Sequence, residues 1–164
     1  MKIEKIVAIT GKPGLYLIIS QGKNSLIVES LQDKKRVPVA SLQNISAISD
    51  IAIYTHDEEV ALKQVFLNMF EKEKGGKAID PKSDKKELLS YFESVLPNFD
   101  EERVYPSNIK KVLLWYNLLV DAGFDFNSLK VEEATEVKEE VKEEVNAAVK
   151  EGKAAKKEKK SKKE

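Results

Sequence analysis

The chain has 164 residues, of which 41% are hydrophobic, and its 28 basic residues are balanced by 28 acidic ones. It contains no cysteine, which excludes disulfides, zinc–thiolate sites, iron–sulfur clusters and thiol nucleophiles. No run approaches the roughly 20 apolar residues that span a bilayer, and the N-terminus does not resemble a signal peptide, so we expect a soluble cytoplasmic protein with no membrane partner.

Residues 1–55 are predicted to form a small β module. Lys12-Pro13-Gly14-Leu15 suits a type II turn, Gln21–Asn24 suits a hairpin turn, and Pro38 restricts its strand to a sheet edge. Because a flat sheet of this size would leave one apolar face in water, we expect an SH3-like barrel or a curled antiparallel sheet. The strands are expected in five apolar runs, at 3–10, 15–20, 25–31, 36–40 and 51–54.

A connecting helix is predicted at residues 56–74. Thr55 and Glu58 have the spacing of a capping box, and apolar residues then recur at helical spacing up to Gly75 and Gly76. Residues 75–83 are polar and are interpreted as a linker.

A helical hairpin is predicted at residues 84–128. Asp84, with Glu87 three residues later, is expected to open its first helix, which ends at Pro97. The second helix is expected to begin near Pro106 and to stop at Gly123. The overall fold class is therefore α+β.

Residues 129–164 form a charged tail of different composition. Glutamates repeat at i+4 in its first half, where like charges oppose helix formation, and the final stretch 146–164 has eight lysines against three glutamates. The sequence predicts that this tail is disordered.

Three stretches resemble a known family. They are Ile6–Tyr16 (IVAITGKPGLY), Val95–Tyr105 (VLPNFDEERVY) and Ile109–Asn117 (IKKVLLWYN). They are similar to an uncharacterised family of small Bacteroidota proteins with an N-terminal and a C-terminal domain of unknown function. The resemblance covers about residues 1–128; it implies a source lineage and a two-part layout, and no activity.

Catalytic, nucleotide and metal sites find little support in the sequence. His56 is the only histidine and falls within the proposed capping box, where a surface role is the simpler interpretation. The glycines at positions 11 and 14 lack the spacing of a phosphate-binding loop. The acidic runs 57–59 and 100–102 lack the spacing of a calcium loop and suit helix starts. We therefore expect no enzymatic activity, no metal and no cofactor.

Five basic residues fall in the predicted turns of the β module. Turn bases gathered at one end of a small barrel can contact RNA phosphates, although ordinary solvated lysines explain them as well. The candidate nucleic-acid-binding residues are Lys12, Lys23, Lys34, Lys35 and Arg36.

Trp115 and Tyr116 are the candidate partner-binding residues. Neighbouring side chains on a helix point about 100° apart, so one of the two is expected in the core while the other can anchor a partner. Packing of both in the core or between helices is nevertheless the simpler interpretation. The sequence thus predicts a non-enzymatic binding protein that associates with RNA or the ribosome through its turn bases and lysine-rich end. The alternative is a protein–protein adaptor that uses the helical hairpin.

Overall fold

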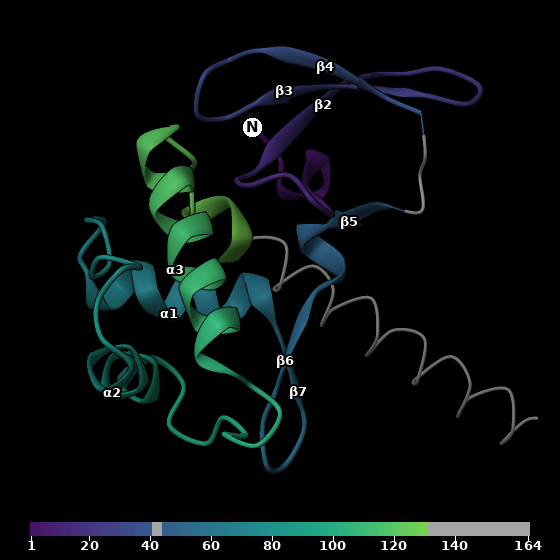
Figure 1. Cartoon of the computed structure of the whole chain (residues 1–164). Coiled ribbons are helices and arrows are strands. Elements are labelled where there is room, and N and C mark those ends of the chain that lie inside the picture. The colour runs from purple at the N-terminus through teal and green to yellow at the C-terminus, as the bar shows by residue number, and fades with distance from the viewer. Residues whose placement is uncertain (41–43, 131–164) are drawn as a thin grey trace, which may run out of the picture. The chain divides into compact units, whose positions relative to one another are not determined.

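The computed structural model describes residues 1–40 and 44–130, in which residues Met1–Leu129 form one compact unit. The fold class is α+β, as predicted: in the described part of the chain an antiparallel sheet comes first and three α-helices follow (Figure 1). Residues 131–164 of the predicted tail lie outside the described part of the chain. Leu129, which the sequence assigned to the tail, is fully buried in the core.

The N-terminal sheet has five antiparallel strands in the order β4-β3-β2-β1-β5. The predicted hairpin between the second and third strands is present, and Pro38 lies in β4 at the edge of the sheet, as expected. The strands are β1 (Ile6–Ile9), β2 (Tyr16–Gln21), β3 (Leu26–Ser30), β4 (Arg36–Val39) and β5 (Ile45–Ala47).

The fifth strand of this sheet is not the predicted one. Residues 51–54 do contain a strand, β6 (Ala52–Tyr54), but it pairs with β7 (Glu59–Ala61) in a separate two-stranded sheet. The fifth strand of the sheet is instead β5, which pairs with β1, is three residues long and has only one large apolar side chain, Ile45. A segment this short and polar gives no strand signal in the sequence.

The five-stranded sheet buries both of its faces. Ile6 packs with the helices, while Val7, the next residue, lies on the opposite face in a second cluster made entirely of sheet residues. Val7 and Val28 in that second cluster are 1% and 0% exposed. Among residues 1–40 and 44–130, no helix contributes to this second cluster. The sheet is open, since β4 and β5 are edge strands that do not pair with each other, so the barrel is not confirmed.

The first helix begins later than predicted. Helix α1 spans Leu62–Lys72, because the residues that precede it form the β6–β7 hairpin. The Thr55 side chain does accept a hydrogen bond from the backbone N–H of Glu58, at 3.0 Å, but this bond closes the hairpin turn and does not cap a helix.

The other two helices begin where the sequence placed them. Helix α2 spans Lys85–Val95, and the carboxylate of Asp84 accepts a hydrogen bond from the N–H of Glu87 at 2.9 Å. Helix α3 spans Pro106–Asp121, with proline at its first position and Gly123 in a left-handed conformation (φ 68°) after its end. The two helices contact each other, but Figure 1 shows α2 along its axis and α3 from the side, and the predicted antiparallel hairpin is not confirmed.

The main core lies between the sheet and the helices. It joins Ile6 of β1 and Leu15 to Phe66 of α1, Phe92 of α2 and Leu113 of α3, all of them at most 1% exposed. None of the helices in residues 1–40 and 44–130 is long and apolar enough to cross a membrane.

Candidate functional site

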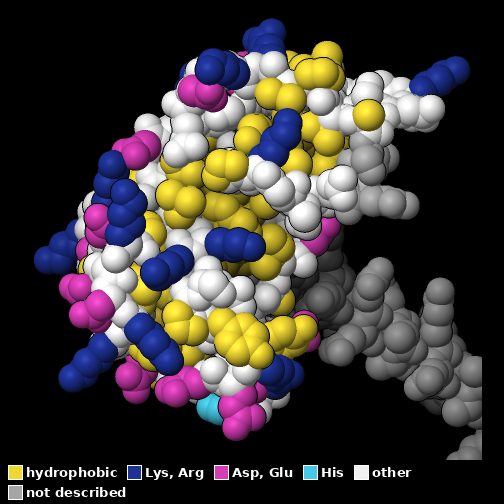
Figure 2. Space-filling model, in the orientation of Figure 1, with side chains coloured by type: hydrophobic (Ala, Val, Ile, Leu, Met, Phe, Trp, Pro, Cys, Tyr) yellow, Lys and Arg dark blue, Asp and Glu magenta, His cyan; other side chains and the backbone are white. Residues whose placement is uncertain are grey.

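A groove runs between the N-terminal sheet and one side of α3. It consists of two adjoining cavities of about 500 and 220 Å³, which share Ile51, Lys111 and Trp115 as lining residues. The larger cavity lies against the β1–β2 turn, and the smaller one lies against β6 and the start of α3. We call these two cavities together the α3 groove. Figure 2 shows that apolar side chains gather in the middle of the visible face, with lysine and arginine side chains among them.

The β1–β2 turn forms one wall of the α3 groove and is held in place by specific contacts. Gly14 has φ +85°, a conformation that favours glycine, and its α-carbon faces Leu118 of α3 closely enough that a β-carbon there would lie 3.6 Å from the Leu118 Cδ1. The Tyr16 hydroxyl donates a hydrogen bond to the carbonyl oxygen of Pro13 at 3.2 Å. The turn, with Lys12 at its tip, therefore lies beside Leu118 of α3, and the Tyr16 hydrogen bond stabilises the conformation of the turn.

Trp115 and Tyr116 point to different environments, as the helical geometry predicts. Trp115 is half-buried, packs on the core and lines both cavities. Tyr116 is fully buried, and its hydroxyl donates a hydrogen bond to the carbonyl oxygen of Gly76 at 2.9 Å. Burial raises the pKa of Tyr116 to about 12. Of the two candidate anchors, only Trp115 is accessible to a partner.

Among the residues that the structure describes, every charged residue that lines the α3 groove is a cation. These residues are Lys12, Lys111 and Arg103. Within residues 1–40 and 44–130, Lys12 and Lys111 form no ion pair. The groove therefore combines an apolar wall with uncompensated positive charge at its rim.

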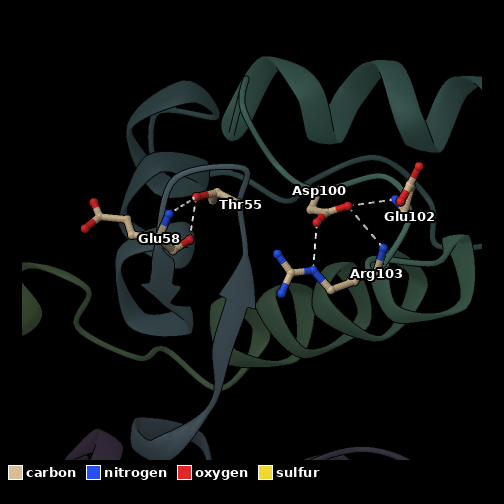
Figure 3. A network of polar contacts seen from close by, with 5 residues as sticks. All are labelled: Thr55, Glu58, Asp100, Glu102 and Arg103. Atoms are coloured by element: carbon tan, nitrogen blue, oxygen red, sulfur yellow. Dashed lines mark hydrogen bonds and ion pairs between the residues drawn. The ribbon is translucent and has the colours of Figure 1, made fainter.

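Arg103 is partly neutralised by a polar network next to the groove. Its Nε donates to the Asp100 carboxylate at 2.7 Å, and that carboxylate also accepts from the backbone N–H of Glu102 at 2.9 Å (Figure 3). The hydrogen bond from Arg103 holds the pKa of Asp100 below its usual value. The Arg103 guanidinium also lies over the ring of Tyr54, 4.6 Å from its centroid. These contacts position the end of the smaller cavity.

The five candidate RNA-binding bases do not form one patch. Tyr16 pairs with Ser30 and Gln21 pairs with Leu26, so the β1–β2 and β3–β4 turns lie at one end of the sheet and the β2–β3 turn lies at the other. Lys12, Lys34, Lys35 and Arg36 share the first end, while Lys23 is at the opposite end.

Two of these bases are already paired with acids. Lys35 contacts the Asp33 carboxylate at 3.3 Å, and Arg36 contacts that of Glu29 at 3.1 Å. Lys34 has φ 57°, which places it in the left-handed region, and its side chain is exposed.

His56 and the acidic run 100–102 lie together. They line a polar depression of about 380 Å³ beside the β6–β7 turn. Within residues 1–40 and 44–130, no group of three or more histidine or acidic side chains could hold a metal ion.

Two family descriptions of unknown function match the chain. Residues 3–48 match "Domain of unknown function (DUF5606)", and residues 51–119 match "Domain of unknown function (DUF6852)". The chain thus matches two family models of unknown function, one after the other, within a single compact unit.

A solved structure identifies the lineage. The solution NMR structure of a Bacteroides vulgatus protein, a target of the Northeast Structural Genomics Consortium, is 46% identical, with a TM-score of 0.62. The alignment covers 76% of this chain and 89% of that one. No curated protein matches the chain. The chain belongs to this uncharacterised family of Bacteroidota proteins, which confirms the resemblance seen in the sequence.

Sequence reasoning missed most of the α3 groove. Lys111, Leu114 and Ile51 were not singled out, because each is unremarkable in its own segment. Only the long-range packing of the β1–β2 turn on α3 brings them together with Lys12 and Trp115. The available signal was the i, i+3, i+4 spacing of Lys111, Leu114 and Trp115, which places these residues on one side of a helix.

Proposed function

We propose that this chain is a cytoplasmic, non-enzymatic adaptor that binds another protein in the α3 groove. The observation that carries the proposal is the position of Trp115, half-buried in the wall of a 500 Å³ cavity that is otherwise lined mainly by apolar and backbone atoms. Tryptophan is enriched among the residues that dominate binding energy at protein interfaces. Cavities of this size that combine apolar walls with a few polar groups are typical of binding sites.

The test is site-directed photo-cross-linking of the full-length chain in a Bacteroidota host. A benzophenone amino acid replaces Leu114, which lines the larger cavity, or Ile27, which is 41% exposed on β3 and lies outside both cavities. We expect discrete protein adducts from position 114 and none from position 27, and we expect Trp115→Ala in the same chain to remove them. If position 114 gives no adduct above the level seen at position 27, the adaptor proposal is wrong.

The second candidate is association with RNA or the ribosome. What favours it is the strand register, which supports a basic end formed by Lys12, Lys34, Lys35 and Arg36. Neutralising Lys34, Lys35 and Arg36 together should reduce the slope of log affinity against log salt by about 2 to 3 units if each contacts a phosphate. The matched control is Lys23→Gln, at the opposite end of the sheet, which should leave the slope unchanged. If the full-length chain fails to bind RNA at low salt up to about 100 µM, this candidate fails.

A further inference from the structure

We infer that the occupant of the α3 groove is an acidic peptide segment of a partner protein that carries a bulky apolar side chain. This inference rests on the proposed adaptor function and specifies the chemistry of the partner. It depends on two independent properties of the groove: the sign of the charges at its rim and the composition of its walls.

The positive charges at the rim favour a ligand with negative charge. The chain has equal numbers of acidic and basic residues, yet the three described charged residues that line the groove are all cations, of which Arg103 is already paired with Asp100. Lys12 projects from the β1–β2 turn and Lys111 from α3, so the two ammonium groups come from the two walls. Neither has an ion pair with any residue in 1–40 or 44–130. Opposite charges at an interface steer association and set specificity, which favours a ligand with carboxylates.

The walls select an apolar side chain. Between the two lysines, the larger cavity is lined by Ile9, Ile51, Leu114 and Trp115. Most of these side chains are aliphatic, and aliphatic walls contribute little to the binding of nucleobases, which proteins bind mainly by stacking on aromatic rings. A peptide that places a leucine or phenylalanine in the cavity would remove apolar surface from water on both partners. The combination of walls and rim therefore fits an acidic peptide better than a single-stranded nucleic acid.

The chain contains its own reporter of groove occupancy. Trp115 is its only tryptophan, so the emission of the full-length protein reports directly on the wall of the groove. Three synthetic peptides without tryptophan or tyrosine serve as probes: the acidic EDELFEDE, the neutral QNQLFQNQ and the basic KRKLFKRK. We expect the acidic peptide to shift Trp115 emission with saturation below about 100 µM, and we expect the other two to bind at least 10-fold more weakly.

Two matched double variants test whether Lys12 and Lys111 contribute to binding of the acidic peptide. Replacing Lys12 and Lys111 together by glutamine should weaken binding of the acidic peptide about 5- to 20-fold, because two rim ion pairs are lost. The control replaces Lys23 and Lys110 by glutamine; both are exposed, lie outside the two cavities and carry the same charge. The control should bind as the unaltered chain does. Added salt should weaken binding to the unaltered chain more than to the Lys12/Lys111 variant.

Four results would overturn the inference. The first is equal binding of the neutral and acidic peptides, and the second is equal loss of binding in the two double variants. The third is a Trp115 response to oligouridylate and to none of the peptides, which would identify a nucleic acid as the occupant. The fourth is an emission change with protein concentration alone, which would identify a second copy of the chain. If cross-linking at position 114 succeeds while the acidic peptide fails, the adaptor function stands and only the ligand chemistry is wrong.

Discussion

The hydroxyl of Tyr116 in α3 donates a hydrogen bond to the carbonyl oxygen of Gly76, forty residues earlier, at 2.9 Å. Asn117 strengthens the same connection, since its side-chain oxygen accepts a hydrogen bond from the N–H of Ala78 at 2.8 Å. Residues 76–78 lie in the segment that the sequence suggested was a linker, and these hydrogen bonds connect them to α3.

Tyr116→Phe should lower the free energy of unfolding by about 1 kcal/mol, because it removes one buried hydrogen bond and leaves the ring packing intact. Urea denaturation followed by far-UV circular dichroism measures the change. The matched control is Tyr105→Phe, because the Tyr105 side chain is 60% exposed. This variant should change the free energy of unfolding by less than about 0.5 kcal/mol. Equal stabilities for the two variants would contradict the role assigned to the Tyr116 hydroxyl.

The same residue should make the fold sensitive to alkaline pH. Burial raises the pKa of Tyr116 from 10.0 to about 12, so the folded state holds the phenol proton more tightly than the unfolded state does. The stabilisation is complete below pH 10 and is lost as the pH rises from about 10 to 12. The stability difference between the unaltered chain and Tyr116→Phe should shrink over that range, which urea titrations at pH 8 and pH 11 would measure. A constant difference would show that the phenol ionises equally in both states.

Leu113→Ala should destabilise the protein by about 2 to 5 kcal/mol, because Leu113 is 0% exposed in the core between α3 and the other helices. Leu114→Ala is the matched control on the same helix. Leu114 is only half-buried and lines the α3 groove, so its loss should cost about 1 kcal/mol. Thermal unfolding of the two variants compares them, and a larger loss for Leu114 would reverse the assignment of the two faces.

Gly14→Ala should be more destabilising than Gly11→Ala. Both glycines have positive φ, +85° and +81°, so alanine is strained by about 1 to 2 kcal/mol at either position. A β-carbon at Gly11 meets no atom within 4 Å, whereas at Gly14 it would lie 3.1 Å from Gln32 Oε1 and 3.6 Å from Leu118 Cδ1. The added crowding at Gly14 is with the Gln32 side chain, since 3.6 Å from Leu118 is an ordinary van der Waals contact. Thermal unfolding compares the two variants, and equal losses of stability would contradict this difference in crowding.

Asp100→Asn should reduce the sensitivity of the fold to acid. The Arg103 side chain lowers the pKa of the Asp100 carboxyl in the folded state, so its stabilising contribution is present above the usual aspartate pKa and is lost as the pH falls below it. The unaltered chain should therefore lose more stability between pH 5 and pH 2 than the Asp100→Asn variant does. Thermal unfolding across that range measures the difference, and parallel curves would exclude Asp100 as a contributor.

The two capping-box patterns show what local sequence could predict. Asp84 and Glu87 form the expected hydrogen bond at the start of α2, and Thr55 and Glu58 form the same kind of bond in a hairpin turn. The pattern specifies the bond between the two residues and not the structure that follows it. Residues 59–61 form β7 because they pair with β6. This pairing between strands outweighs the helical spacing of the apolar side chains in the segment.

The candidate site was less predictable than the fold, because it is formed by residues from distant segments of the chain. Helical geometry predicted that Trp115 and Tyr116 would point in different directions, and core packing of both was the simpler interpretation. Tyr116 is buried, and Trp115 packs on the core while it also lines the groove. The sequence placed Lys12 in a turn and contained no information that this turn would pack against Leu118 and lie beside Lys111. Contacts between distant segments depend on packing, which local spacing does not encode.

The main core is built from both family domains. Ile6 and Leu15 belong to the segment 3–48, and Phe66 and Leu113 belong to the segment 51–119, yet all four lie in one apolar cluster. A gene encoding either segment alone would produce a chain whose apolar face has lost its cover. We therefore expect either segment, expressed alone, to expose apolar surface and to aggregate.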